Sequence, residues 1–147
     1  VMFMKKIAVI SIMSYYARQI FDGSKEYEFR KTPLMEELLN TKIYVYSAKE
    51  DKAIIGYFKV DNILCGNINE ILKLTGYDKR NDGFEIVNYF GKDRSKCYAL
   101  HLSDINKFNK KLSLSEMRRI KENVSMPQYI KYIYEDDPLY GYIVELK

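Results

Sequence analysis

Residue types that bind metals or form crosslinks are scarce in this chain. It has one histidine, two cysteines, three prolines and no tryptophan. A zinc site of the usual ligands would need groups from distant segments, so neither a metal nor a cofactor is predicted. Cys65 and Cys97 lie far apart in strand-like segments, which indicates reduced, buried thiols rather than a disulfide framework. His101 alternates with Ala99 and Ser103 and is interpreted as a structural strand residue.

Several common catalytic and targeting motifs are also missing. There is no phosphate-binding loop ending in Gly-Lys-Ser/Thr, no dinucleotide Gly-x-Gly-x-x-Gly and no His-Glu-x-x-His zinc helix. No uninterrupted apolar run approaches the ~20 residues of a membrane span, and the N-terminus lacks the long apolar region of a secretory signal. The sequence therefore predicts a cytoplasmic protein that does not act at a membrane.

Nothing in the composition divides the chain. No stretch is rich in proline, glycine or serine, and no internal repeat is visible. A length of 147 residues suits one hydrophobic core and is too short for two comfortable domains, so we predict a single domain over residues 1–147. With 47% hydrophobic and 30% charged residues, the composition excludes neither an enzyme nor a binding module.

The formal charge of +4 is mild, and the basic residues are scattered along the chain. This balance permits a polyanionic partner without requiring one. The basic residues either converge as a phosphate-binding surface or form an ordinary solvated surface. They include Lys5, Lys6, Arg30, Lys31, Lys107, Lys110, Lys111, Arg118, Arg119 and Lys121.

What is abundant is tyrosine, with 14 residues. A tyrosine offers a ring for stacking and a hydroxyl for hydrogen bonding, which suits nucleobase or ligand surfaces. Most of these tyrosines are expected to pack in strands and in the core. A few remain as candidates for a binding site.

The apolar pattern predicts strands in the first half of the chain. Residues 5–13 form a first strand, and residues 26–31 alternate charged and aromatic side chains as a half-buried strand does. Residues 43–47 and 53–64 are two further strands, which the charged connection 48–52 joins as an antiparallel pair. A later strand is expected over residues 96–105.

Helix signals separate these strands. Ser14 is expected to cap a first helix that ends at Gly23. Asn67 with Glu70 and Ser113 with Glu116 have the spacing of capping boxes. A short helix is expected before Gly91, a helical turn over residues 128–134 and a last strand over residues 141–146. The fold class is α+β, with a curved or barrel-like antiparallel sheet and peripheral helices.

The segment from Gly23 to Arg30 holds the most informative side chains. Glu28 and Arg30 share one face of the expected strand, while Lys25 lies at the turn before it. Arg30 is a fixed positive fork that can hold a phosphate or a carboxylate. Lys25 is a point charge that becomes a nucleophile or base if burial lowers its pKa. The same three charges could equally form an ion pair that holds the helix-to-strand corner.

This segment resembles the Gly-x-Lys-x-x-Glu-x-Arg signature of ASCH domains in the PUA-like superfamily. Further segments match in the same order and extend the resemblance over nearly the whole chain. They are Ile10–Ile12, Tyr16-Ala17, Ile20–Lys25, Ile43–Ser47, Ile54–Phe58, Tyr89-Phe90, Cys97–Leu100, Met126–Tyr129 and Tyr132. The resemblance implies a PUA-like β-barrel with peripheral helices and a charged cleft beside the first helix. It also implies binding of RNA or modified nucleobases, and some members hydrolyse acetylated cytidine or act as ribonucleases.

The first hypothesis is a module that binds RNA, a nucleotide or a modified nucleoside. Lys25 and Arg30 would meet a phosphate or a base edge, and Glu28 would order them or accept from a base amine. Stacking and polar contacts would come from five further residues. These are Tyr16, Tyr46, Ser47, Gln128 and Tyr132.

The second hypothesis is a small hydrolase that acts on a modified nucleoside or on single-stranded RNA. Lys25 and Glu28 would then be the catalytic pair, assisted by a hydroxyl of Ser11, Ser24 or Ser47. A third possibility is a regulatory domain that recognises another protein. In that case the basic face of residues 118–121 would matter more than the cleft. The sequence leaves the oligomeric state open.

Overall fold

The computed structural model describes residues 3–147, and its contacts divide the chain into two compact units. The first unit comprises residues 3–25, 41–59 and 104–147, and the second comprises residues 26–40 and 60–103. Six strands form one sheet in the order β2-β5-β4-β3-β1-β6. Two long strands, β4 (Ala53–Gly66) and β5 (Cys97–Ser113), belong in part to each unit.

The first unit is built around β1 (Lys6–Met13), which pairs parallel with β3 (Ile43–Ala48) and antiparallel with β6 (Ile130–Tyr134). A parallel pair cannot be joined by a tight turn, so the chain leaves β1 through α1 (Ser14–Phe21) before it returns to β3. The predicted antiparallel pairing of β3 with β4 is confirmed.

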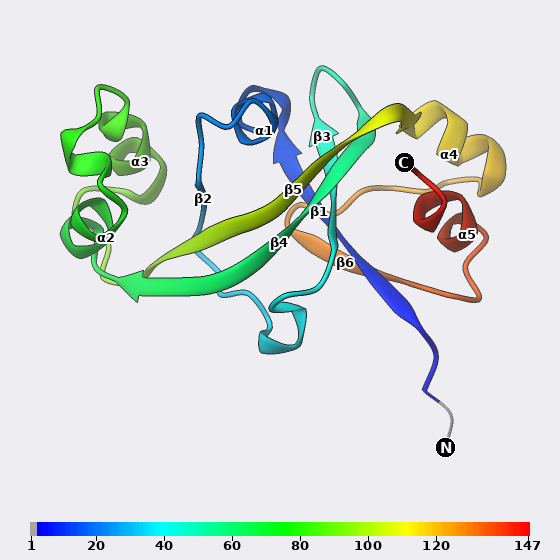
Figure 1. The fold of residues 1–147 in the computed structure, drawn as a ribbon, viewed down its shortest axis with the longest axis horizontal. Helices are drawn as coiled ribbons and strands as arrows, with labels where there is room; N and C mark the ends of the chain where they lie inside the picture. Colours follow the sequence, from blue (N-terminus) through cyan, green and yellow to red (C-terminus); the bar gives the residue numbers. More distant parts are fainter. Residues whose placement is uncertain (1–2) are drawn as a thin grey trace. The chain divides into compact units, whose positions relative to one another are not determined.

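Two short helices complete this unit, α4 (Leu114–Ile120) and α5 (Leu139–Val144), and Figure 1 shows them near the C-terminus. The predicted capping box at α4 is confirmed, because the Ser113 hydroxyl accepts from the Glu116 amide and the Glu116 carboxylate accepts from the Ser113 amide. Met117 is fully buried and joins α4 to the core. That core also contains Val9, Tyr44, Tyr46, Ile54, Phe108, Leu112, Val124, Ile133, Leu139 and Ile143.

The second unit contains β2 (Tyr27–Arg30), the first half of β5 and the helices α2 (Ile68–Thr75) and α3 (Gly83–Phe90), which Figure 1 shows side by side. Short 3-10 turns lie at η1 (Glu36–Leu38) and η2 (Tyr77–Lys79). The capping box of Asn67 with Glu70 is confirmed. The core of this unit is an aromatic and aliphatic cluster of Phe29, Ile68, Ile71, Tyr77, Ile86, Phe90, Cys97 and Ala99.

Three local predictions are wrong. Residues 128–134 do not form a helical turn, because β6 spans Ile130–Tyr134 and pairs with β1. Residues 141–146 do not form a strand, since α5 covers most of them. Its start is stabilised by the Asp137 carboxylate, which accepts from the Leu139 amide at 2.9 Å. Ser14 does not cap α1, because it is the first helical residue and its hydroxyl donates to the Ala48 carbonyl at 2.7 Å.

Other predictions need smaller corrections. Strand β5 continues to Ser113, well beyond the expected end at Ile105. Cys97 is buried, whereas Cys65 is exposed, and both thiols are free. The α+β class is confirmed, but β2 and β6 stand at the two ends of the strand order and β1–β3 is parallel, so a closed antiparallel barrel is not confirmed. Between residues 3 and 147, no helix is both long and apolar enough to cross a membrane.

One close approach fixes the packing of α1 in the first unit. Gly56 lies so near the ring of Phe21 that an added Cβ would stand 2.6 Å from a ring carbon and 2.4 Å from the Asn106 carbonyl oxygen. Gly141, inside α5, has open space around the same position. Gly56 therefore leaves room for the Phe21 ring, whereas Gly141 has no such packing role and lowers the stability of α5.

Gly56→Ala is expected to lower the free energy of unfolding by ~1–3 kcal/mol, because the methyl group overpacks the contact between α1 and β4. Gly141→Ala is the matched control and is expected to raise it by ~0.5–1 kcal/mol through helix propensity. Urea unfolding of the two variants measures both values. Equal stability of Gly56→Ala and the unmodified protein would contradict the close packing.

Candidate functional site

Lys25 lies in the first unit, immediately after α1. Lys25 is buried, with 5% of its surface exposed. Its ammonium group lies 4.7 Å from the centre of the Tyr16 ring. Its backbone amide donates to the Gln19 carbonyl at 3.1 Å, so the end of the helix holds the residue in place. Gly23 makes the turn possible with a φ of 85°, as predicted. Two predicted site residues, Tyr16 and Lys25, are thus brought together.

Glu28 and Arg30 lie in the second unit, on β2, and share one face of the strand as predicted. Nε and Nη2 of Arg30 both donate to Oε2 of Glu28, at 3.0 and 2.8 Å. The side chains are 5% and 16% exposed. A buried carboxylate costs free energy unless it is paired, and Arg30 supplies such a pairing for Glu28.

Two tyrosines of the second unit feel the charges of this pair. Burial raises the pKa of Tyr77 to about 12; the Arg80 charge opposes this increase, and the Glu28 charge makes a smaller contribution to it. Burial also raises the pKa of Tyr89. The positive charge of Arg30 opposes this increase, and the negative charge of Glu28 adds to it. The Tyr77 hydroxyl is buried and has no hydrogen-bond partner among residues 3–147. The Glu28–Arg30 pair is therefore part of a desolvated charged and phenolic environment.

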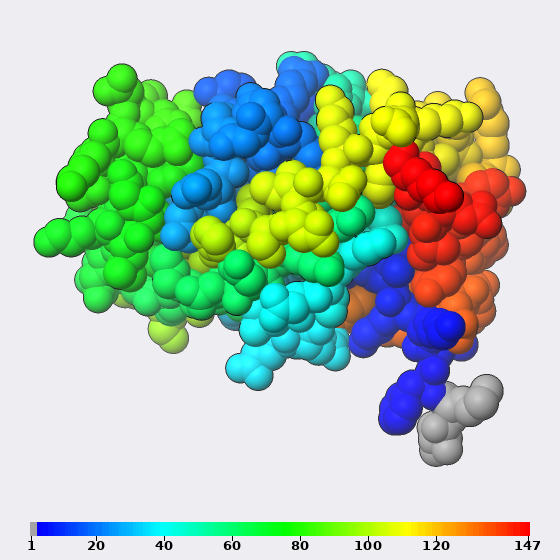
Figure 2. Space-filling model, in the orientation of Figure 1, coloured from blue at the N-terminus to red at the C-terminus, as the bar shows by residue number. Residues whose placement is uncertain are grey.

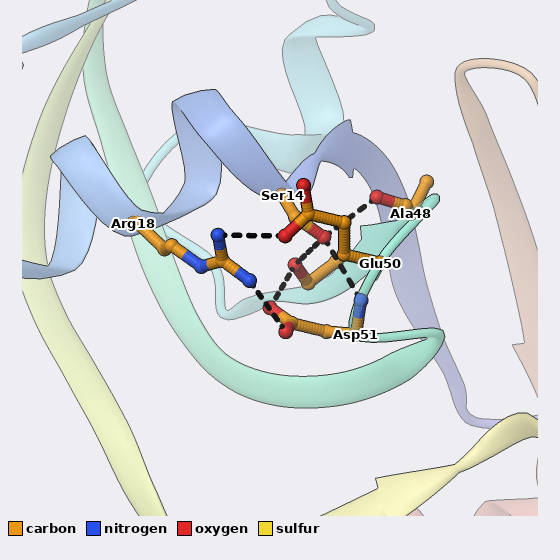
Figure 3. Close-up of polar contacts among 6 residues, drawn as sticks. Ser14, Arg18, Ala48, Glu50 and Asp51 are labelled. Carbon is orange, nitrogen blue, oxygen red and sulfur yellow. Dashed lines mark hydrogen bonds and ion pairs between the residues drawn. The ribbon is translucent and has the colours of Figure 1, made fainter.

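Ser47 is fully buried in the first unit, at the end of β3. Its hydroxyl lies 2.9 Å from the Ser14 hydroxyl and 2.7 Å from Oδ2 of Asp51. Figure 3 shows how Arg18, projecting from α1, completes the cluster. Nη1 of Arg18 contacts Glu50 at 2.9 Å and Nη2 contacts Asp51 at 3.0 Å.

This cluster stabilises the β3–β4 turn. The Asp51 amide donates to the Ser14 hydroxyl at 3.1 Å, while that hydroxyl donates to the Ala48 carbonyl. The hydrogen bond from Ser47 is the largest cause that lowers the pKa of Asp51, and Arg18 adds to it. Because Ser47 has no exposed surface, its predicted direct contact with a nucleic acid stays a prediction without support from its position.

Tyr46 is also buried in β3, with 5% of its surface exposed. Burial raises the pKa of its hydroxyl, and the positive charge of Arg118 opposes that increase. Arg118 itself is exposed, and its Nε donates to the Val124 carbonyl at 3.2 Å. A phenol that stays protonated at neutral pH can donate a hydrogen bond or a proton, and the neighbouring guanidinium can bind an anion.

The last two predicted residues lie at and near β6. Gln128 is exposed, and the carbonyl of the next residue, Tyr129, accepts from the Ser11 amide at 2.9 Å. Tyr132 is half-buried and lies opposite Ala8 of β1. The ammonium group of Lys6 stands 4.1 Å from the centre of its ring. Tyr132 is thus a ring that already holds a cation, as Tyr16 does.

Sequence reasoning missed the residues that join these elements. Arg18 and Asp51 lie on α1 and on the β3–β4 turn, and their spacing in the sequence gives no sign that they meet. The effect of the Arg118 charge on the pKa of Tyr46 is equally long-range in the sequence. Among residues 3–147, no three side chains of His, Cys, Asp or Glu gather in a way that could hold a metal ion.

Comparisons with known proteins point to one family. No protein-family model matches the chain. A curated protein from Zymomonas mobilis, named ASCH domain-containing ribonuclease, is 26% identical over 134 residues, which cover 90% of this chain and 88% of that protein.

Solved structures from Zymomonas mobilis share the fold. The crystal structure of its ASCH protein has a TM-score of 0.79 at 24% identity and covers 95% of this chain and 95% of that one. A variant of that protein in which a tyrosine is replaced by phenylalanine gives a TM-score of 0.80 at 24% identity, over 97% of this chain and 100% of that one. The shared fold and the sequence match both support the resemblance to ASCH domains that the segment from Gly23 to Arg30 indicates.

Proposed function

We propose that this protein binds RNA through the charged segment from Lys25 to Arg30, on the ASCH form of the PUA-like fold. The observation that carries the proposal is the burial of Lys25 and Glu28, which are 5% and 4% exposed within four residues of each other in the chain. Burial of charge costs free energy and is concentrated at functional sites. The ribonuclease name of the Zymomonas mobilis relative supports RNA as the partner.

Each side chain has a role that follows from its contacts. Arg30 is held by two hydrogen bonds to one oxygen of Glu28, so its guanidinium plane is fixed before a phosphate arrives. Lys25 supplies a second positive charge beside the Tyr16 ring. Tyr16 can in turn offer ring surface to a base, and Tyr132 and Gln128 are further contacts in this proposal.

Lys25→Met is expected to weaken binding of single-stranded RNA about 10-fold at low salt and to reduce the salt dependence by ~0.7 in slope, because one phosphate contact is lost. The methionine keeps the length of the buried side chain. Fluorescence anisotropy of a labelled oligonucleotide over a salt series measures both quantities.

Lys73→Ala is the matched control, because Lys73 is an exposed lysine on α2. It is expected to change the affinity less than two-fold, and thermal unfolding verifies that both variants remain folded. Equal affinities of Lys25→Met and Lys73→Ala would remove Lys25 from the RNA site.

A second candidate function is cleavage of RNA, which the name of the curated relative favours. Lys25 and Glu28 form one candidate acid and base pair. Tyr46 and Arg118 form a second candidate site, in which the phenol would donate a proton and the guanidinium would hold the phosphate. The second pair combines an exposed cation, able to meet a phosphate, with a phenol that burial keeps protonated.

Tyr46→Phe is expected to reduce RNA cleavage at least ~100-fold if the hydroxyl donates a proton or a hydrogen bond to the reacting phosphate. Tyr44→Phe is a closely matched control, because Tyr44 lies two residues away on β3 and is also 5% exposed. Cleavage of a 3′- and 5′-labelled oligonucleotide, followed on a denaturing gel, measures the rate.

Loss of cleavage in Lys25→Met, with Tyr46→Phe unaffected, would transfer the chemistry to Lys25 and Glu28. Turnover of acetylated cytidine without RNA cleavage would instead identify a modified-nucleoside amidohydrolase. RNA binding without any turnover would leave the first proposal standing alone.

A further inference from the structure

Two hollows open on the first unit along the second half of β5. The first has a volume of about 550 Å³ and is lined by residues that include Arg18, Phe21, Lys107 and Lys111. The second has a volume of about 450 Å³, and its lining includes Lys110, Lys111, Arg119 and Tyr142. Lys111 lines both hollows, so the two are neighbours along one strand.

We propose that this strip binds the flanking part of a single-stranded RNA, beyond the segment from Lys25 to Arg30. It is called the β5 track here and is defined by Lys107, Lys110, Lys111, Arg119 and Tyr142. The inference rests on the proposed RNA function, and it adds a second, independent contact surface to it.

The period of the strand explains how the cations are displayed. Side chains alternate along β5, so Lys107 and Lys111 share one face, while Phe108 and Leu112 of the other face are buried in the core. Lys110 belongs to the same face as Phe108 and Leu112, but it is exposed whereas they are buried. Lysines therefore line both hollows, with Lys107 and Lys111 at the first and Lys110 and Lys111 at the second.

The charge left open on this surface is positive. Among residues 3–147, Lys107, Lys110, Lys111 and Arg119 form no hydrogen bond or ion pair through their side chains. Four carboxylates also line the two hollows. Three of them already accept hydrogen bonds, whereas Glu145 at the second hollow accepts none from the described residues. Asp22 accepts from Ser24, Asp51 accepts from Ser47 and Glu116 accepts from Ser113. These internal bonds are also the largest causes that lower the pKa of each carboxylate.

Aromatic surface lies beside these cations. Tyr142 is 55% exposed at the second hollow, and Phe21 lines the first. An exposed ring beside cations suits a single-stranded nucleic acid, since such a ring can stack on a base while the cations follow the phosphates. Tyr142 offers such a ring, whereas Phe21 is half-buried. An acidic protein segment would use the cations but would leave the rings without a role, so RNA is the favoured occupant.

The C-terminal segment forms the side of the track. The Asn109 amide donates to the Lys147 carbonyl at 2.8 Å, which holds the last residue against β5. Figure 2 shows the yellow surface of the second half of β5 directly beside the red C-terminal residues. Tyr142 on α5 is thereby kept near Lys110 and Lys111.

The test compares two triple variants that remove the same charge. Lys107→Ala/Lys110→Ala/Lys111→Ala is expected to weaken binding of a 12-nucleotide RNA at least ~10-fold and to lower the salt slope by about 2, since three phosphate contacts are lost. The matched control is Lys73→Ala/Lys79→Ala/Lys92→Ala, which removes three exposed lysines of the second unit. It is expected to change the affinity less than three-fold.

Length dependence separates the track from the Lys25–Arg30 segment. A dinucleotide is expected to bind the track variant as well as the unmodified protein, and Tyr142→Ala is expected to weaken binding of the 12-mer alone. If Lys25→Met weakens binding of the 12-mer while the two triple variants behave alike, the track is wrong and the proposed function stands. If the unmodified protein binds neither RNA, both are wrong.

The identity of the occupant is tested by competition. An acidic peptide of matched charge is expected to displace the 12-mer from the unmodified protein poorly. If the peptide binds as tightly as the RNA and Tyr142→Ala affects neither, the surface is a protein-binding face and the RNA assignment is overturned.

Discussion

The parallel pairing of β1 with β3 is the constraint on which the rest of the structure depends. Strands that run parallel need a long return path, and here that path carries α1, the turn at Lys25 and strand β2 with Glu28 and Arg30. The charged segment is thus not an appendage to the fold. It is part of the connection that joins β1 to β3.

Burial makes the segment costly as well as ordered. An ion pair such as Glu28 with Arg30 contributes little net stability when it is buried, because desolvation offsets the attraction between the charges. The Glu28 side chain is 5% exposed and that of Arg30 is 16% exposed, and Arg30 donates two hydrogen bonds to a single oxygen of Glu28. Its geometry is therefore better explained by orientation of a guanidinium than by stability. The same reasoning applies to Lys25, whose charge is placed against the Tyr16 ring.

Features set by neighbours in the sequence were predictable, and features set by distant partners were not. The capping boxes at Asn67 and Ser113 depend on residues three apart, and both are confirmed. Residues 130–134 are rich in isoleucine and tyrosine, which favour strands, so the prediction of a helical turn over residues 128–134 misjudged a local signal. Pairing with β1 then holds these residues as β6. The cluster of Ser47, Asp51 and Arg18 was missed because its members come from three elements.

Tyr44 and Tyr46 show how far a sequence can assign chemistry. They stand two residues apart on β3, share a face and have the same exposed fraction of 5%. Burial raises the pKa of both hydroxyls, but the other charges that act on Tyr44 are the phenols of Tyr140 and Tyr57, whereas Tyr46 feels the guanidinium of Arg118. The first environment is that of a packed core, whereas in the second a positive charge acts on the phenol. This difference between the two tyrosines comes from Arg118 on α4, which is more than sixty residues away in the chain. The sequence alone therefore does not distinguish Tyr46 from Tyr44 as a candidate for chemistry on a phosphate.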